Sequence, residues 1–268
     1  MKLLEIKQVQ AILLELMKKV HLFLEEKNIP YYMLGGNALG AVRHGGFIPW
    51  DDDIDIGMFR EDYERFLDIC REFDSSYDIV NYRNSKNCDF VLTRIYFPNT
   101  YIDNPSIKNT KLDKRLYFDI FPIDNVPDDD NVLAKFESNI KSRKTLINRI
   151  DVRNYNNSLH INAVKKVISL ILSPLRNKIL KSTEKTMRTY EKENTARVCS
   201  LCSQYSFKKQ VMPKSYYGTP TLYKFEDEMF YAPNDIDSYL KTLFGDDYME
   251  VPPENKRRKG CNIYSLEE

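Results

Sequence analysis

A short segment of alternating acidic and apolar residues, Asp53-Ile54-Asp55-Ile56, sets the strongest limit on the fold. Alternation with a period of two predicts a β-strand, because successive side chains of a strand point to opposite faces. We therefore expect an extended segment over 47–58, with the isoleucines in the core and both carboxylates on the other face. Two carboxylates ~5 Å apart repel by about 3 kcal/mol at an effective dielectric constant near 20. Such a pair favours a bound cation, and oxygen-only ligands favour Mg²⁺ or Mn²⁺.

Three other interpretations of this segment stay open. One is a solvated acidic loop, although the regular alternation of the isoleucines argues against it. Another is a calcium loop of the helix–loop–helix type, which Asp51, Asp53 and Asp55 partly fit. That loop needs glycine where this chain has Ile56. The last is the Asp-x-Asp motif of metal-dependent glycosyltransferases, which is too short to be specific.

Two adjacent glycines precede the acidic segment. We expect a buried strand at 31–34, a turn at Gly35-Gly36-Asn37 and a short helix ending at Arg43. Backbone N–H groups at such a turn can hold phosphate, and an arginine one helical turn further on can pair with it. An alternative is a purely structural turn with Asn37 as an N-cap. We predict that these two glycines, Asn37 and Arg43 bind substrate.

A further carboxylate, Asp119, lies among large apolar side chains in the segment 116–123, which reads as a strand. An ionised carboxylate in such a strand is costly unless it is paired or metal-bound. We predict that Asp53, Asp55 and Asp119 bind the metal and carry out catalysis. Asp124, expected in a turn just past this strand, is a weaker candidate for substrate binding. Trp50, beside the acidic segment, either contacts a cationic headgroup or packs in the core.

The remaining segments indicate an α/β (α+β) fold, with a mixed sheet flanked by helices and a helical insertion. The expected helices are 3–27, 61–73 and 236–244, with further strands at 77–82 and 90–97. We expect a catalytic core over 1–130, a basic helical insertion or subdomain over 131–195, broken at Ser173-Pro174, and a C-terminal part over 196–268 that completes the catalytic domain.

The overall charge is nearly zero, with 40 Lys and Arg against 39 Asp and Glu, which excludes a typical nucleic-acid-binding protein. This balance hides a strong local excess, because residues 141–188 contain twelve Lys or Arg and only Asp151 and Glu184 as acids. A basic amphipathic stretch within that segment, 164–172, either lies on an anionic membrane or packs against the core.

The cysteines and the hydropathy give expectations about location. Five cysteines do not form a disulfide framework, and the pair Cys199 and Cys202 lacks the partners that a zinc site needs. The first residues do not form a signal peptide, and no stretch approaches the ~18–20 apolar residues that span a bilayer. We expect a cytoplasmic protein, with a peripheral contact on the inner membrane face through residues 141–188.

The sequence resembles the LicD family, which is related to the fukutin-related proteins. The matching blocks are the run from Leu34-Gly35-Gly36-Asn37 to Asp53-Ile54-Asp55, then Phe118-Asp119-Ile120-Phe121-Pro122-Ile123-Asp124, then Phe225-Glu226-Asp227, Tyr239-Leu240, Phe244-Gly245-Asp246 and Pro252-Pro253-Glu254.

The resemblance implies a nucleotidyltransferase-like fold and a metal-dependent phosphotransferase that acts on a CDP-alcohol donor, CDP-choline in the best-known case. Phosphocholine would pass to a sugar hydroxyl of teichoic acid, lipopolysaccharide or a capsule precursor, often on a lipid carrier, and CMP would leave. By analogy, Asp53, Asp55 and Asp119 would hold the metal, and Gly35, Gly36 and Arg43 would contact the diphosphate. The alternatives that we keep are a nucleotide-sugar glycosyltransferase and a non-catalytic glycan-assembly protein.

Overall fold

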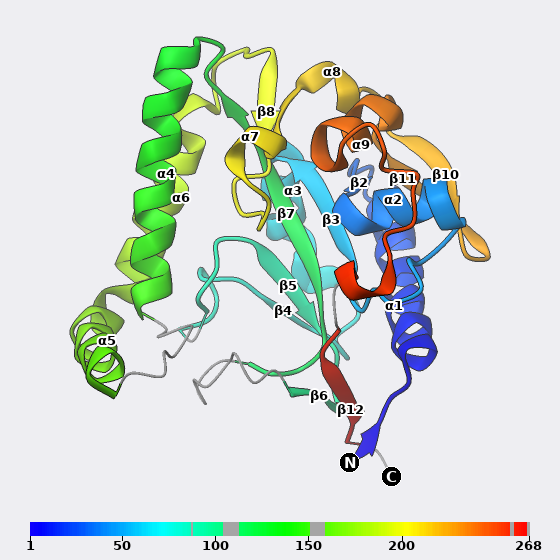
Figure 1. Cartoon of the computed structure of the whole chain (residues 1–268), viewed down its shortest axis with the longest axis horizontal. Coiled ribbons are helices and arrows are strands. Elements are labelled where there is room, and N and C mark those ends of the chain that lie inside the picture. Colours follow the sequence, from blue (N-terminus) through cyan, green and yellow to red (C-terminus); the bar gives the residue numbers. More distant parts are fainter. Residues whose placement is uncertain (87, 104–112, 151–158, 258–259, 267–268) are drawn as a thin grey trace.

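In the computed structural model a mixed sheet forms the centre of the molecule (Figure 1). The structure describes residues 1–86, 88–103, 113–150, 159–257 and 260–266. Within these, the sheet has seven strands, and its main path is β2 (Tyr32–Met33), β3 (Asp55–Phe59), β7 (Tyr117–Val126), β5 (Thr93–Tyr96) and β4 (Asp78–Val80). Strands β8 (Arg197–Cys199) and β9 (Val211–Pro213) continue it from the end of β7. Only β3 and β7 run parallel among the described pairs, so the expected mixed sheet is confirmed.

Helices pack against both faces of this sheet. Helix α3 (Arg60–Ile69) contacts β3 and β7, and its Tyr63 hydroxyl lies 2.6 Å from that of Thr93 on β5. Helix α2 (Gly35–His44) packs against α9 (Ile236–Phe244), and α7 (Phe207–Gln210) and α8 (Lys214–Tyr217) also contact α9.

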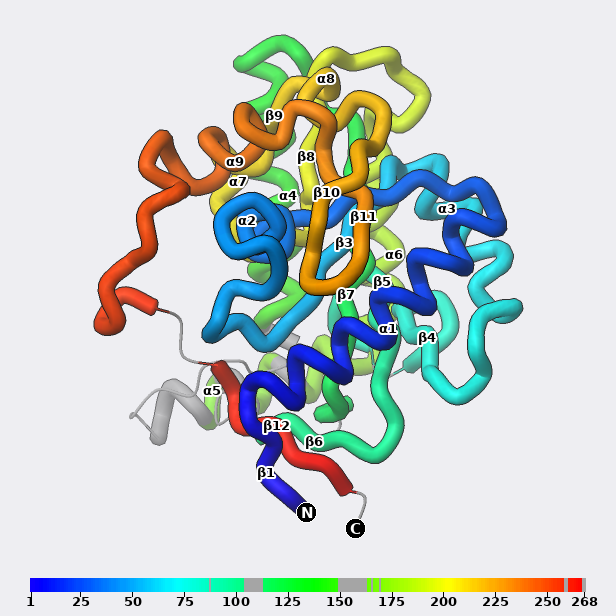
Figure 2. Tube along the Cα trace, turned by 90° about the vertical axis from the view of Figure 1, so that its right-hand side faces the viewer, coloured from blue at the N-terminus to red at the C-terminus, as the bar shows by residue number. Residues whose placement is uncertain are grey.

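Helix α1 and a hairpin lie together on one side of the molecule. Helix α1 (Ile6–Glu26) crosses this side diagonally, and the hairpin of β10 (Thr221–Phe225) and β11 (Glu228–Ala232) lies beside it (Figure 2). The two ends of the described chain meet in a small sheet. Its strands are β1 (Lys2–Leu3), β12 (Asn262–Ser265) and β6 (Thr100–Asp103).

A helical layer follows β7 in the chain. Helix α4 (Asp130–Ile150) lies beside α6 (Arg176–Met187), and α5 (Leu159–Leu172) packs at the far end of α4 (Figure 1). The predicted break at Ser173-Pro174 is present as the 3₁₀ turn η2 (Ser173–Leu175). A second apolar cluster joins this layer to the sheet: Val126 and Cys199 from the strands, with Phe136, Ile140, Ile147, Leu180 and Met187 from the helices. None of the described helices is long and apolar enough to span a membrane.

Two local expectations were wrong. The predicted extended segment over 47–58 is mostly a loop, and β3 begins only at Asp55. A turn in which the Asp51 amide donates to the Ile48 carbonyl (2.9 Å) interrupts it. The predicted turn at Gly35-Gly36-Asn37 is the first turn of α2, because the Asn37 amide donates to the Leu34 carbonyl and so closes the helix early. Short 3₁₀ turns also occur at η1 (Cys70–Glu72), η3 (Arg188–Tyr190) and η4 (Glu254–Lys256).

Candidate functional site

The parallel pairing of β3 with β7 places two of the predicted carboxylates side by side. Asp55 is the register partner of Asp119, and Asp119 is in turn the register partner of Arg94 on β5. Register partners on adjacent strands point to the same face of a sheet. Asp55, Asp119 and Arg94 therefore form a row across one face of the sheet.

Arg94 is the counter-charge of Asp119. Its Nε donates to Asp119 Oδ1 at 2.8 Å, and its guanidinium lies 4.3 Å from the ring centre of Phe90 and 3.9 Å from that of Tyr117. Burial raises the pKa of Asp119, and Arg94 opposes this rise without cancelling it. Arg94 therefore supplies part of the counter-charge that the sequence analysis assigned to a metal ion. Sequence analysis did not predict this ion pair. A cation just before a hydrophobic strand segment, Arg94-Ile95-Tyr96, was the available signal.

Asp53 lies just before β3 and belongs to the same electrostatic environment. Its charge contributes to the raised pKa of Asp119. Arg94 lowers the pKa of Tyr117, but burial and the charges of Asp119, Asp53 and Asp55 outweigh this and raise it to about 12. The structure thus brings the three predicted carboxylates within electrostatic reach of one tyrosine.

The closest described group of three potential metal ligands is different from the predicted one. One oxygen from each of Asp51, Asp52 and Asp53 lies within 4.8 Å of the others. This loop is held from two directions: the Gln10 amide donates to the Ile48 and Asp51 carbonyls, at 3.1 and 3.0 Å. Asp52 Oδ2 accepts from the Cys261 amide at 2.8 Å.

The first turn of α2 supports the acidic segment. Asn37 is buried, its amide donates to the Asp53 carbonyl (3.2 Å), and its oxygen accepts from the Asp55 amide (2.6 Å). Asn37 thus holds the backbone around Asp53 and Asp55 in place. It is not the N-cap of α2, because Leu34 has that position. The Gly35 amide donates to the Tyr239 hydroxyl (2.9 Å). A Cβ at Gly36 would lie 2.5 Å from Asp51 Oδ2, so this glycine allows the acidic loop to approach the helix.

Arg43 and Trp50 contact the C-terminal part of the chain. Arg43 Nη1 donates to the carbonyls of Tyr248 and Glu250, at 2.9 and 3.0 Å. Trp50 is half-buried against the core, as the alternative to substrate binding predicted, and the Arg257 guanidinium lies 4.4 Å from its ring centre. A cation therefore already occupies one face of this ring in the structure.

Asp124 lies apart from the other predicted residues. It is part of β7 and not of a turn, and its two oxygens accept from Arg60 of α3 at 2.7 and 2.8 Å. Asp119 and Asp124 are five positions apart in one strand, so they point to opposite faces and are separated by roughly 16 Å. Asp124 is almost completely buried. We therefore assign it to a structural ion-pair network and not to the site.

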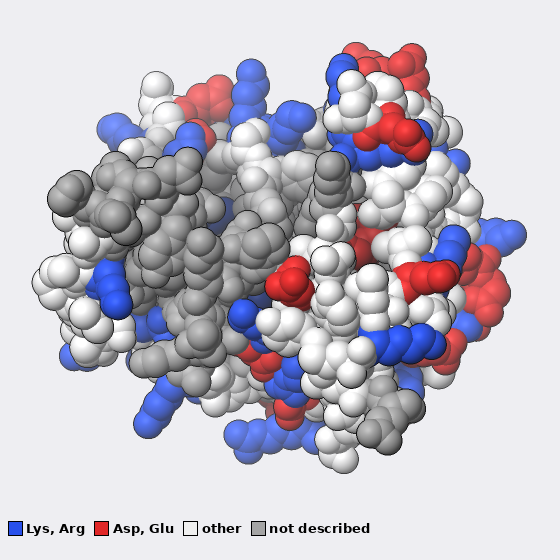
Figure 3. Space-filling model, turned by 60° about the horizontal axis from the view of Figure 1, so that its bottom comes forward, with Lys and Arg blue, Asp and Glu red and all other residues white. Residues whose placement is uncertain are grey.

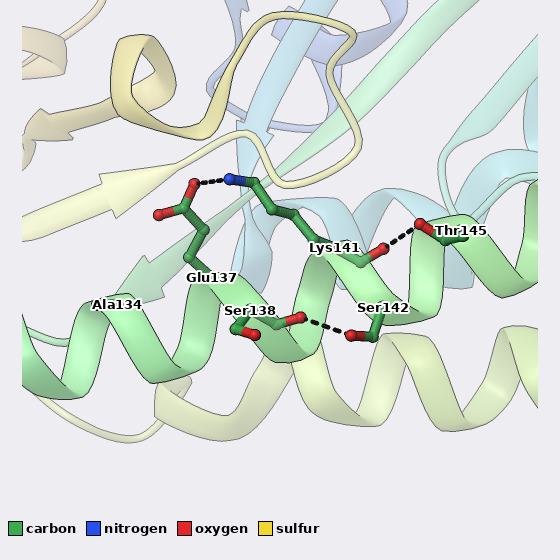
Figure 4. Close-up of a pocket in the computed structure, with 6 residues that line it drawn as sticks. All are labelled: Ala134, Glu137, Ser138, Lys141, Ser142 and Thr145. Atoms are coloured by element: carbon green, nitrogen blue, oxygen red, sulfur yellow. Dashed lines mark hydrogen bonds and ion pairs between the residues drawn. The ribbon is translucent and has the colours of Figure 1, made fainter.

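Two surface hollows lie elsewhere. One, of about 520 Å³, is on α4 and is lined by small and polar side chains, with Glu137 and Lys141 paired at its edge (Figure 4). The other, of about 380 Å³, lies between the end of α3 and β4. Neither includes a predicted site residue.

Comparison with known proteins gives one domain match and several relatives. Residues 28–149 match the model of the LicD/FKTN/FKRP nucleotidyltransferase domain, a range that contains α2, the acidic segment and β7. This part of the chain is therefore similar to the nucleotidyltransferase domain of the LicD family. The lipopolysaccharide cholinephosphotransferase LicD of Haemophilus influenzae is 27% identical over 96% of both chains. The human ribitol 5-phosphate transferase FKRP is 51% identical over 39 residues, which are 15% of this chain and 8% of FKRP. An uncharacterised Rickettsia prowazekii protein, RP689, is 43% identical over 28% of both chains. The LicD family model thus covers all nine predicted site residues.

Proposed function

We propose that this protein transfers phosphocholine from CDP-choline to a sugar hydroxyl of lipopolysaccharide or a related, lipid-linked cell-surface glycan, with release of CMP. The observation that carries the proposal is the row of Asp55 and Asp119 on adjacent parallel strands, with Asp53 next to them and the first turn of α2 clamped to the same segment. The similarity to a cholinephosphotransferase over nearly the whole length supports the choice of substrate.

The residues present fit a divalent cation. The ligands on offer are carboxylate oxygens only, which suits Mg²⁺ or Mn²⁺. Asp53 belongs both to the predicted set, with Asp55 and Asp119, and to the close group with Asp51 and Asp52. We propose Asp53 as the common ligand, with Asp55 and Asp119 as the others. A bound cation would neutralise charge on the phosphate oxygens during transfer.

The protein side chains have distinct roles in this proposal. Asn37 fixes the backbone on both sides of Ile54, which sets the separation of Asp53 and Asp55. Arg94 keeps the buried Asp119 carboxylate oriented through their hydrogen bond. We propose that Asp119 also accepts the proton of the attacking sugar hydroxyl. The Gly35 amide already donates to Tyr239, so the diphosphate would have to compete with that contact.

The test is donor turnover. The purified protein is incubated with Mg²⁺, a lipopolysaccharide acceptor and one donor: CDP-choline, CDP-glycerol, CDP-ribitol or a UDP-sugar. We expect CMP with CDP-choline, only when acceptor is present, and no product after EDTA. Asp53→Asn removes a proposed ligand and should lower turnover roughly a hundredfold or more.

A matched control separates this effect from a general loss of charge. Asp68→Asn changes an exposed carboxylate on α3 and should leave turnover unchanged. Release of UDP from a UDP-sugar would favour a glycosyltransferase. Normal turnover by the Asp53→Asn variant would refute the ligand assignment.

A further inference from the structure

Helix α5 presents an uncovered apolar face. Four large apolar side chains on it are more than half exposed: Val164 (59%), Val167 (55%), Leu170 (68%) and Ile171 (65%). Leu175, in the 3₁₀ turn that follows, is also exposed. Sequence analysis left open whether this stretch packs against the core. The exposure of these four side chains shows that they do not pack against the core.

These side chains lie on one side of the helix. At 100° per residue, Val164, Val167, Leu170 and Ile171 fall within an arc of about 120°. The exposed Lys166 lies roughly 40° beyond one edge of this arc. Exposed apolar side chains concentrated on one helix face commonly mark an interaction site.

The surroundings of α5 are basic. Lys178, Lys181 and Lys185 follow in the next helix, α6, and all three are exposed. Their spacing of three and four residues places them on one side of α6. Over residues 141–188 the charge is 12 − 2, or +10, whereas the rest of the chain carries 28 − 37, or −9. On the face of the molecule that Figure 3 shows, most of the visible acidic side chains gather at the right.

An apolar helix face with flanking lysines has the chemistry of an interfacial helix on an anionic membrane. Docking of a second copy through the same face would bring two segments of charge +10 together, and the repulsion would oppose it. We propose that α5 docks this protein on the surface of an anionic lipid bilayer, with Val167 and Leu170 in the acyl boundary and the lysines at the headgroups.

The position of α5 in the fold suits such a role. Helix α5 lies at the lower end of the molecule in Figure 1 and Figure 2, the end at which β3 and β7 begin. Asp55 and Asp119 are in the first residues of these two strands. Docking through α5 would turn this end of the sheet toward the membrane. The inference on docking stands without the proposed function, but it agrees with an acceptor held in a membrane.

Flotation of the full chain with vesicles tests the proposal. We expect the protein to float with vesicles of equal parts phosphatidylglycerol and phosphatidylcholine, to stay behind with pure phosphatidylcholine, and to dissociate as the salt concentration rises. The double variant Val167→Glu with Leu170→Glu should bind the anionic vesicles more weakly by a factor of roughly ten or more. Lys178→Glu with Lys181→Glu should also weaken binding to the anionic vesicles.

The controls make the result decisive. Leu222→Glu changes an exposed apolar side chain on β10 and should bind like the unchanged protein. Circular dichroism checks that each variant folds. CMP release with a detergent-dispersed acceptor should be the same for the α5 variants, so loss of docking and loss of catalysis are separate outcomes.

No flotation with anionic vesicles at low salt, or equal flotation of the double variant, would overturn the proposal. A dimer that the double variant dissociates, without vesicle binding, would instead identify a second copy as the partner.

Discussion

The guanidinium of Arg94 lies between the rings of Phe90 and Tyr117 and donates to Asp119. Planar stacking holds an arginine in one orientation, and a lysine at this position could not stack or donate in the same way. Backbone contacts are equally restrictive in α2. A Cβ at Gly40 would lie 2.4 Å from the Gly46 carbonyl oxygen, which is main chain and cannot turn away.

Gly40→Ala should therefore destabilise the protein by about 1–3 kcal/mol, because α2 must move away from the loop that leads to the acidic segment. Gly36→Ala is the matched control in the same helix. The new Cβ there lies too close only to the carboxylate of Asp51, a side chain that can rotate, and makes an ordinary contact with Ile48. We expect a change in unfolding free energy below about 1 kcal/mol for Gly36→Ala, and urea unfolding of the two variants measures the difference. Equal losses in both would contradict this reading of the contacts.

At the scale of elements, the hairpin of β10 and β11 supports the same loop. Glu226 occupies the turn of the hairpin with a φ of 57°, and its Oε1 accepts from the Phe47 amide at 2.9 Å. Its own amide donates to the Gly45 carbonyl at 2.8 Å. The hairpin thus fixes the backbone just upstream of the Asp51 to Asp55 segment.

Glu226→Ala should lower turnover about tenfold while the chain stays folded, because the Phe47 amide loses its acceptor and the loop relaxes. Glu226→Gln keeps an acceptor oxygen and should recover most of the activity. Asp227→Ala alters the neighbouring hairpin residue, whose exposed carboxylate pairs with Lys18, and serves as the control. Turnover of each variant with CDP-choline decides the matter. The assignment of Glu226 as a positioning residue fails if Gln and Ala behave alike.

At the scale of the whole molecule, a buried network of charges joins the helical layer to the sheet. Arg60 of α3 donates to Asp124 of β7 and to Glu184 of α6, and the Tyr82 hydroxyl also donates to Glu184. Removing one partner from a buried ion pair is strongly destabilising, since the other charge stays buried. The network therefore holds α6, and the chain leading from α5, in a fixed relation to the central sheet.

Glu64 makes this network sensitive to pH. Burial would raise the pKa of Glu64, but Arg83, Arg188 and Arg60 outweigh it and lower the pKa below the ordinary value. A carboxylate with a lowered folded-state pKa stabilises the protein above its unfolded pKa, near 4.3, and loses this effect as the pH falls through the folded value.

Glu64→Gln should therefore cost about 1–3 kcal/mol of unfolding free energy at pH 7, and the difference should shrink below about pH 4. Urea unfolding across a series of pH values measures it. Glu61→Gln, at an exposed position in the first turn of the same helix, should show a much smaller effect. A difference that persists unchanged at pH 3 would show that the ion pairs are not its source.

Most helices and strands, and the residue types of the candidate site, could be predicted from the sequence. The apolar periodicity of α1, the helix at 236–244, the strand around Asp119 and the break at Ser173 follow from local patterns, because these depend on the period of side chains along a helix or strand. The acidic segment and the two glycines could likewise be recognised as candidate site residues from their residue types.

Tertiary structure decided which residues meet. Arg94 joins Asp119 through strand pairing, Asn37 closes on Asp53 and Asp55, and Asp124 is drawn away to Arg60 on the other face. It also decided that the apolar side of α5 stays uncovered. Strand order, register and the packing partner of a face are set by contacts between residues far apart in the chain. A local pattern of hydrophobicity and charge specifies that a face needs a partner, and only the folded chain specifies which one.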